Sequence, residues 1–143
     1  MVIIAAIDRS DRAADVVREA EALATAFDEP VHVLHVLSTS EFVNLGRTRA
    51  EEGDPIDLDE VREVAAVIAA EKADDLDVPF EAVGRMGDAA EVIVNHATDQ
   101  NARYIVVSGR KRSPAGTAIF GSVTQSVLLK ADCPVVSTIN QAD

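Results

Sequence analysis

A basic, glycine-punctuated loop contains the residues best suited to bind a small anion. The loop begins at Gly109, passes through three successive cations and reaches Gly121-Ser122, where a helix is expected to start. Residues 100–131 contain five cations and no acid, although the whole chain has a net charge of -12. Free N–H groups at a helix start attract anions, so phosphate is the first candidate ligand. The three cations are Arg110, Lys111 and Arg112.

Asp8 is a second candidate. It directly follows the apolar run Val2–Ile7, which has the length and composition of a strand buried on both faces. Ser10, two residues later, is a plausible N-cap for the helix that follows. Two interpretations of Asp8 therefore stay open, because its carboxylate could contact a ligand or simply help to cap that helix.

The three histidines are assigned structural roles. His32 and His35 lie an odd number of positions apart on one expected strand, so their side chains face opposite sides and cannot jointly bind one metal ion. His96 falls on the apolar stripe of an expected helix, at the margin of the core. The sequence therefore predicts no metal site and no Ser-His-Asp arrangement.

Five apolar runs of strand length alternate with stretches of helical periodicity. This alternation predicts an α/β fold, a doubly wound five-stranded parallel sheet with helices on both faces. Ligands bind such a sheet outside the strand carboxyl ends at a switch point, which Asp8 and Gly109 would flank. The expected strands are Val2–Ile7, Val31–Leu37, Val78–Gly84, Tyr104–Ser108 and Val135–Ile139.

The starts of the later helices are marked, whereas one long connection is not. The connection from Ser38 to Asp54 is polar, acidic and weakly patterned, which is typical of a lid, a binding loop or a disordered segment. Three helices open on the spacing of a capping box. The three motifs are Asp57-x-x-Glu60, Asp88-x-x-Glu91 and Ser122-x-x-Gln125.

Length and composition limit the classes of function. Residues 1–143 are expected to form a single domain. The acidic balance argues against nucleic acid and membrane surfaces as partners. One cysteine excludes an internal disulfide, and the N-terminal apolar run is too short to span a membrane, so a cytoplasmic location is expected. Three lysines against ten arginines in an Asp-rich chain favour a halophilic protein, with an ordinary acidic cytosolic protein as the alternative.

Three segments share a pattern with one known family. They are Asp8 after the first strand, G-S-V-T at residues 121–124, and C-P-V-V at residues 133–136. These segments resemble the universal stress protein (UspA) family, and the composition is similar to that of a haloarchaeal-type member. The resemblance implies the strand order 3-2-1-4-5 of the adenine nucleotide alpha hydrolase-like fold, a stress-response role, and a homodimer paired through the last strand, Val135–Ile139.

Many members of that family bind ATP through the pattern G-x2-G-x9-G-[S/T]. The resemblance therefore implies ATP or AMP, with or without Mg²⁺, as the ligand. Gly109 matches the first glycine and Gly121 the last, while Asp8 and Val36 match positions that contact the adenine. The nucleotide-binding residues so expected are Asp8, Val36, Gly109, Arg110, Arg112, Gly121, Ser122 and Val123.

The loop departs from the family pattern at its middle glycine. Arg112 occupies that position, and the spacing from Arg112 to Gly121 is one residue shorter than the pattern requires. Glycine lets the backbone approach a phosphate closely, so two outcomes are open. Arg110 and Arg112 could hold the phosphates through their side chains. Alternatively, the chain binds no nucleotide and acts as a dimeric stress or interaction module.

Other chemistries fit the sequence less well. Gly116-Thr117 lacks the lysine of a Walker loop, and no G-x-G-x-x-G follows a strand. A phosphoacceptor receiver domain would need clustered acids after the first strand, where Asp8 stands alone. No general base can be named, so slow ATP hydrolysis is the most that is expected and the chain is not classed as an enzyme. The loop glycines could also be plain turns, and its cations a solvated patch.

Overall fold

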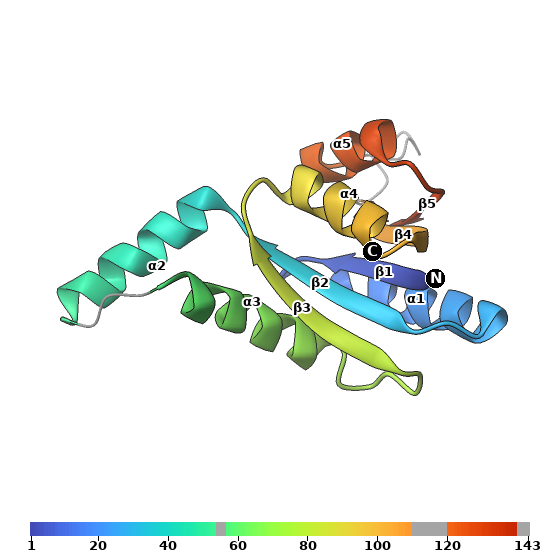
Figure 1. The fold of residues 1–143 in the computed structure, drawn as a ribbon, viewed down its shortest axis with the longest axis horizontal. Coiled ribbons are helices and arrows are strands. Elements are labelled where there is room, and N and C mark those ends of the chain that lie inside the picture. The colour runs from blue at the N-terminus through green and yellow to red at the C-terminus, as the bar shows by residue number, and fades with distance from the viewer. Residues whose placement is uncertain (54–56, 110–119, 140–143) are drawn as a thin grey trace.

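The computed structural model describes residues 1–53, 57–109 and 120–139, and its strands form one sheet of order β3-β2-β1-β4-β5 (Figure 1). All neighbouring pairs in this sheet are parallel, which confirms the predicted fold class and strand order. The strands are β1 Val2–Ile7, β2 Val31–Leu37, β3 Phe80–Met86, β4 Ala102–Gly109 and β5 Val135–Ile139. The helices are α1 Ala13–Phe27, α2 Thr39–Glu51, α3 Leu58–Lys72, α4 Ala89–Asp99 and α5 Ser122–Lys130.

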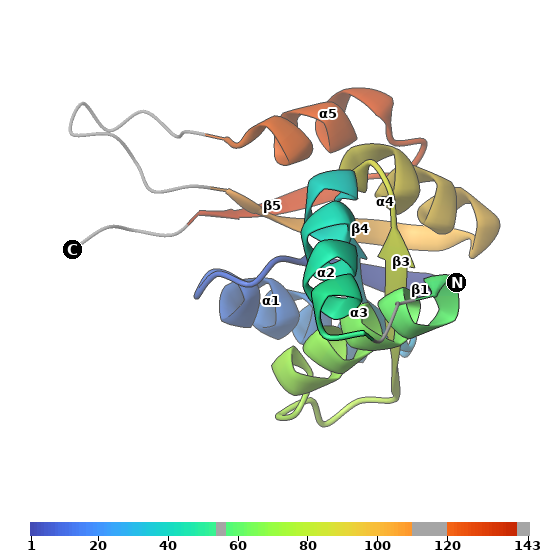
Figure 2. The same ribbon diagram turned by 90° about the vertical axis from the view of Figure 1, so that its left-hand side faces the viewer.

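Helices cover both faces of the sheet. In Figure 2, α1 and α3 lie on one side of the strands and α4 and α5 on the other. Ile3 and Ala5 of β1 belong to the core cluster under α1 and α3, whereas Ile4 belongs to the cluster under α4 and α5. Because helices cover both faces, every residue of β2 is buried, including His32 and His35, which explains why the other five residues of this strand are all aliphatic.

A glycine lets α3 lie directly on β3. A Cβ atom on Gly84 would be 2.1 Å from the Arg62 carbonyl oxygen and 2.3 Å from the Ala66 backbone nitrogen. No side chain fits in that space, so residue 84 must be glycine for the two elements to approach this closely. β3 is an edge strand, as expected, but it begins and ends two residues later than Val78–Gly84.

The helix starts agree only in part with the expected caps. Asp57 and Asp88 cap α3 and α4 by accepting hydrogen bonds from the residues three positions on. The predicted capping box at Ser122 is wrong, because Gly121 is the N-cap and no described side chain caps α5. Ser10 as the N-cap of α1 is also wrong. Its hydroxyl accepts a hydrogen bond from the Arg12 N–H at 3.2 Å, and this bond forms a turn just before α1, whose N-cap is Arg12.

The expected irregular connection from Ser38 to Asp54 is wrong, because most of it forms α2. Ser38 and Glu41 form a reciprocal cap: the Glu41 N–H donates to the Ser38 hydroxyl at 3.2 Å, and the Ser38 N–H donates to the Glu41 carboxylate at 3.3 Å. The helix projects beyond the carboxyl end of β2, away from the sheet (Figure 1). A helix with little core to contact carries little apolar periodicity, so only its cap marked it in the sequence.

Candidate functional site

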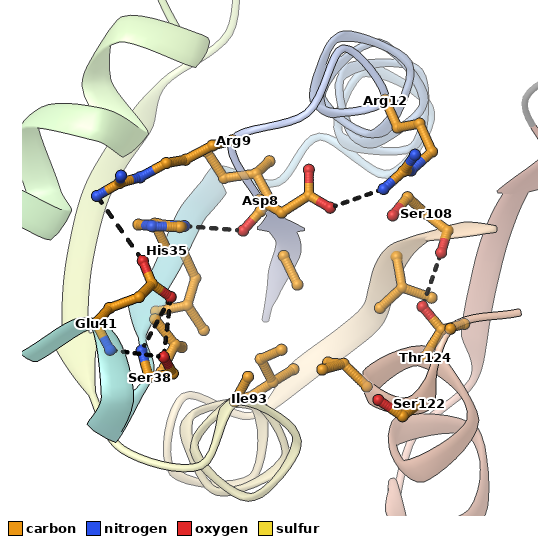
Figure 3. Close-up of a pocket in the computed structure, with 18 residues that line it drawn as sticks. Asp8, Arg9, Arg12, His35, Ser38, Glu41, Ile93, Ser108, Ser122 and Thr124 are labelled. Atoms are coloured by element: carbon orange, nitrogen blue, oxygen red, sulfur yellow. Dashed lines mark hydrogen bonds and ion pairs between the residues drawn. The ribbon is translucent and has the colours of Figure 1, made fainter. Parts of the chain in front are cut away.

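A cavity of about 380 Å³ opens at the carboxyl ends of β1, β2 and β4, between α4 and the start of α5 (Figure 3). Such sheets bind ligands at this edge, where the chain crosses from one face to the other. Residues from the turn after β1 and from the start of α2 complete the rim. The cavity is lined by Ala6, Ile7, Asp8, Arg9, Arg12, Leu34, His35, Val36, Ser38, Glu41, Ala89, Ile93, Val107, Ser108, Gly121, Ser122, Val123 and Thr124.

Aliphatic side chains form part of the cavity wall. Leu34 and Val36 of β2, Val107 of β4 and Ile93 of α4 belong to the core cluster on the α4 and α5 face of the sheet. The wall is therefore continuous with the hydrophobic core and is held in place by it. An apolar wall next to a few polar groups is typical of small-molecule sites and suits a flat organic ring.

Asp8 is the centre of a hydrogen-bonded turn at the end of β1. Its carboxylate accepts hydrogen bonds from the Ser10 N–H at 2.9 Å and from the Ser10 hydroxyl. Partial burial would raise the pKa of Asp8, but the Ser10 hydrogen bonds and the Arg12 charge outweigh that effect and lower the pKa. Asp8 is therefore ionised at neutral pH, both shaping the turn and facing the cavity.

His35 brings a buried ring nitrogen to the cavity wall. Its Nδ1 atom lies 3.1 Å from the Ile7 carbonyl oxygen, which can only accept, so Nδ1 donates its hydrogen to that oxygen. The Nε2 atom is buried and has no hydrogen-bond partner in the described part of the chain. The histidine is 4% exposed. His35 thus has the buried, hydrogen-bonded position that a structural role requires, and it also lines the cavity.

The start of α5 forms the opposite end of the cavity. Gly121, Ser122, Val123 and Thr124 all line it. Among the residues that the structure describes, no side chain caps this helix, and its first turn contains no acid. The positive end of the helix dipole is thus open to an anion in the cavity.

The predicted site residues separate into three groups. Asp8, Val36 and the triplet 121–123 line the same cavity, although they come from three distant parts of the chain. Gly109 is not among the lining residues. A Cβ atom there would lie 2.4 Å from the Thr138 carbonyl oxygen, so β5 alone requires a glycine at that position. Arg110 and Arg112 lie outside the described residues.

Several polar residues of the rim were missed by the sequence interpretation. Arg9 and Arg12 follow Asp8 in the β1–α1 turn, and Ser38 and Glu41 follow β2. The Arg9 guanidinium lies 3.8 Å from the Glu41 carboxylate, and this long, exposed pair links the turn to α2. Their position directly after two central strands was the only signal that could have identified them.

A second polar cluster lies at the other end of the sheet. His32 Nδ1 and His96 Nε2 are 3.1 Å apart, and His32 Nε2 is 3.4 Å from the Glu81 carboxylate. Burial lowers the pKa of both histidines, and their mutual repulsion adds to this for His96. His32 and His35 do face opposite sides of the sheet, as predicted. Among the described residues no group of three or more His, Cys, Asp or Glu could hold a metal ion.

Comparison with known proteins gives a consistent result. Residues 1–137 match the model of the universal stress protein family. The universal stress protein YxiE of Bacillus subtilis (strain 168) is 29% identical over 141 residues, covering 94% of this chain and 95% of that protein.

Solved structures extend the comparison. The structure of a universal stress protein from Archaeoglobus fulgidus is 33% identical and has a TM-score of 0.61, covering 95% of this chain and 96% of that one. Another, the universal stress protein from Archaeoglobus fulgidus in complex with dAMP, is 25% identical with a TM-score of 0.56, covering 95% and 94%.

Proposed function

The chain belongs to the universal stress protein family, and we propose that it binds an adenine nucleotide, ATP or AMP, in the cavity at the carboxyl ends of β1, β2 and β4. One observation carries the proposal: an apolar wall and an uncapped helix N-terminus face the same cavity. A base suits the wall and a phosphate suits the helix. The dAMP complex of a relative that is 25% identical supports an adenine nucleotide.

In this proposal the base lies beside Asp8 and Val36, and the phosphates meet Ser122, Val123 and the loop that precedes them. Arg110 and Arg112 of that loop are additional phosphate ligands, in place of the backbone contact that a glycine would allow. Gly109 begins that loop, and the close approach of β5 by itself requires a glycine there, whether or not the residue also contacts the nucleotide. ATP binding is expected to be strengthened by Mg²⁺, which shields charge between phosphates.

Thermal unfolding with and without nucleotide tests this proposal. AMP or Mg²⁺-ATP at about a hundred times its dissociation constant should stabilise the fold by about 2.7 kcal/mol. Ser122→Glu places a carboxylate at an exposed first position of α5, where it suits the helix dipole but repels a phosphate. The variant should therefore fold normally and lose the nucleotide-induced shift.

Leu58→Glu is the matched control. Leu58 is the first residue of α3, is 52% exposed and lies outside the cavity, so the same charge is added to a different helix start. This variant should keep the full shift. A wild-type protein whose melting temperature does not change with either nucleotide would contradict the proposal and favour the alternative, an interaction module that binds no nucleotide.

We further propose that the protein is a homodimer paired through β5. The strand is at the edge of the sheet, its residues are half-buried in the monomer, and Leu129 of the adjacent helix is 87% exposed. An open strand edge beside an apolar side chain invites a second copy. Sedimentation equilibrium should give twice the 15.2 kDa chain mass, and a monomer at all concentrations would refute the pairing.

The cellular setting that we propose is a stress response in a cytoplasm at high salt. No helix in the described ranges is long and apolar enough to cross a bilayer. A net charge of -12 with only three lysines is tolerated best where salt screens the self-repulsion. The melting temperature should therefore rise steadily as KCl increases from about 0.1 M to about 2 M. A melting temperature that stops rising near the physiological ionic strength of about 0.15 M would indicate an ordinary acidic protein.

A further inference from the structure

Arg12 is a cation at the cavity whose hydrogen-bonding capacity is largely unused. Its Nε atom is buried without a partner among the described residues. The guanidinium makes one contact in that part of the chain, from Nη2 to the Asp8 carboxylate at 3.5 Å. An arginine has five N–H donors, and a contact of this length is at the weak limit of a hydrogen bond.

The turn after β1 fixes the point from which the Arg12 side chain extends. The Arg12 N–H donates to the Ser10 hydroxyl, which itself donates to Asp8, so Asp8, Ser10 and Arg12 form one hydrogen-bonded unit. The Arg12 side chain is 30% exposed, which leaves part of the guanidinium accessible. A ligand would therefore meet a cation whose backbone is already ordered.

The direction of the side chain connects it with α5. In Figure 3, Arg12 lies on the side of Asp8 that is nearer to Ser108 and Thr124, whereas Arg9 lies on the side of His35 and Glu41. Ser108 and the first turn of α5 line the same cavity. Arg12 and the open N-terminus of α5 thus face one space from two sides.

We propose that Arg12 binds the nucleotide's phosphate from the side opposite α5 and so makes the site select nucleoside phosphates over nucleosides. This inference rests on the proposed function. The planar guanidinium can turn a second pair of N–H groups toward phosphate oxygens while Asp8 keeps its two Ser10 hydrogen bonds. Asp8 orients the guanidinium, and the phosphate provides the stronger partner that it lacks.

The experiment compares the affinities of adenosine, AMP and inorganic phosphate for the wild type and Arg12→Gln by calorimetry at one fixed ionic strength. A lost charge-assisted contact should weaken AMP about tenfold to a hundredfold and leave adenosine within about twofold. Arg12→Lys keeps the charge but not the fork, so it should restore only part of the AMP affinity. Inorganic phosphate should compete with AMP in the wild type and not with adenosine.

Arg18→Gln is the matched control, because Arg18 lies in α1, the helix that follows Arg12, has a side chain that is 77% exposed and pairs with Asp15 outside the cavity. It should leave all three affinities unchanged. Equal weakening of AMP and adenosine in Arg12→Gln, or no change in either, would overturn the inference while the proposed function stands. A wild type that binds none of adenosine, AMP and Mg²⁺-ATP would overturn both.

Discussion

Thr124 donates its hydroxyl hydrogen to the Ser108 carbonyl oxygen at 2.7 Å, which joins the first turn of α5 to the carboxyl end of β4. Thr124 is 6% exposed and Ser108 is half-buried, so this bond is partly buried. Both residues line the cavity. The bond therefore holds the N-terminus of α5 against the cavity, although no side chain in the described ranges caps the helix itself.

Thr124→Val tests that connection. Valine has nearly the same shape but leaves the Ser108 carbonyl without its donor, so the free energy of unfolding should fall by about 1–3 kcal/mol in urea denaturation. Thr138→Val is the comparison, because its hydroxyl lies 3.5 Å from the Val107 carbonyl oxygen on a half-buried edge strand. Thr138→Val should lower the free energy of unfolding by less than about 0.5 kcal/mol. Equal losses in the two variants would show that the Thr124 hydrogen bond stabilises the fold no more than the Thr138 contact does.

Gly109→Ala separates a packing role from a ligand role. The new Cβ would lie 2.4 Å from the Thr138 carbonyl oxygen and 3.3 Å from the Phe120 ring, so β5 must shift. We expect a loss of about 2–3 kcal/mol or more in urea, with nucleotide present or absent. Gly53→Ala, where only the positive φ of 78° opposes a side chain, should cost about 1 kcal/mol. Normal stability with lost binding would instead assign Gly109 to the ligand.

The buried histidine pair should make stability fall at mildly acidic pH. Burial lowers the folded-state pKa of His32 and His96 below the unfolded value of about 6.5. The unfolded chain therefore takes up protons first, so stability is complete above about pH 6.5 and declines as the pH falls toward the folded-state pKa values. His96→Gln should flatten the dependence of unfolding free energy on pH between about 7 and 5.

Glu81→Gln, at the same cluster, should change the pH dependence of the unfolding free energy in the opposite direction from His96→Gln. The Glu81 carboxylate raises the pKa of His32 against the effect of burial, and Arg85 adds to the lowering. Without that carboxylate the decline below about pH 6.5 should become steeper than in the wild type. A profile identical to the wild type in both variants would show that the pair does not contribute.

Ser38→Ala should loosen α2. The serine hydroxyl accepts the hydrogen bond that caps the helix, and its backbone N–H donates to Glu41. Alanine keeps the N–H but lacks the hydroxyl, and the loss of the hydroxyl should cost the helix about 1 kcal/mol. Amide hydrogen exchange in α2 should quicken about fivefold, because local opening reports this helix better than global unfolding does. Thr39→Ala, at the exposed first residue of α2, should leave exchange rates nearly unchanged.

Strand and helix patterns were readable because they are local properties of the sequence. Val2–Ile7, Val31–Leu37 and Val135–Ile139 were predicted with the bounds that the structure has. Asp57 and Asp88 were recognised as caps because the acceptor and its N–H donor are three residues apart. α2 escaped notice since it buries little apolar surface, and periodicity reports burial rather than helicity.

The sequence by itself determined the fold class, the edge of the sheet at which a ligand would bind, and part of the cavity lining: Asp8, Val36 and residues 121–123. The fold class, the edge, Asp8 and the helix start at residues 121 and 122 follow from alternating patterns and from the rule that the carboxyl ends of parallel strands share one edge, whereas Val36 and Val123 came from the resemblance to the family. Only the tertiary structure decided the contacts of Arg12, His35 and Gly109. Whether a donor is unpaired, a ring nitrogen buried, or a Cβ excluded depends on distances between segments far apart in the chain, and local patterns carry no information about those distances.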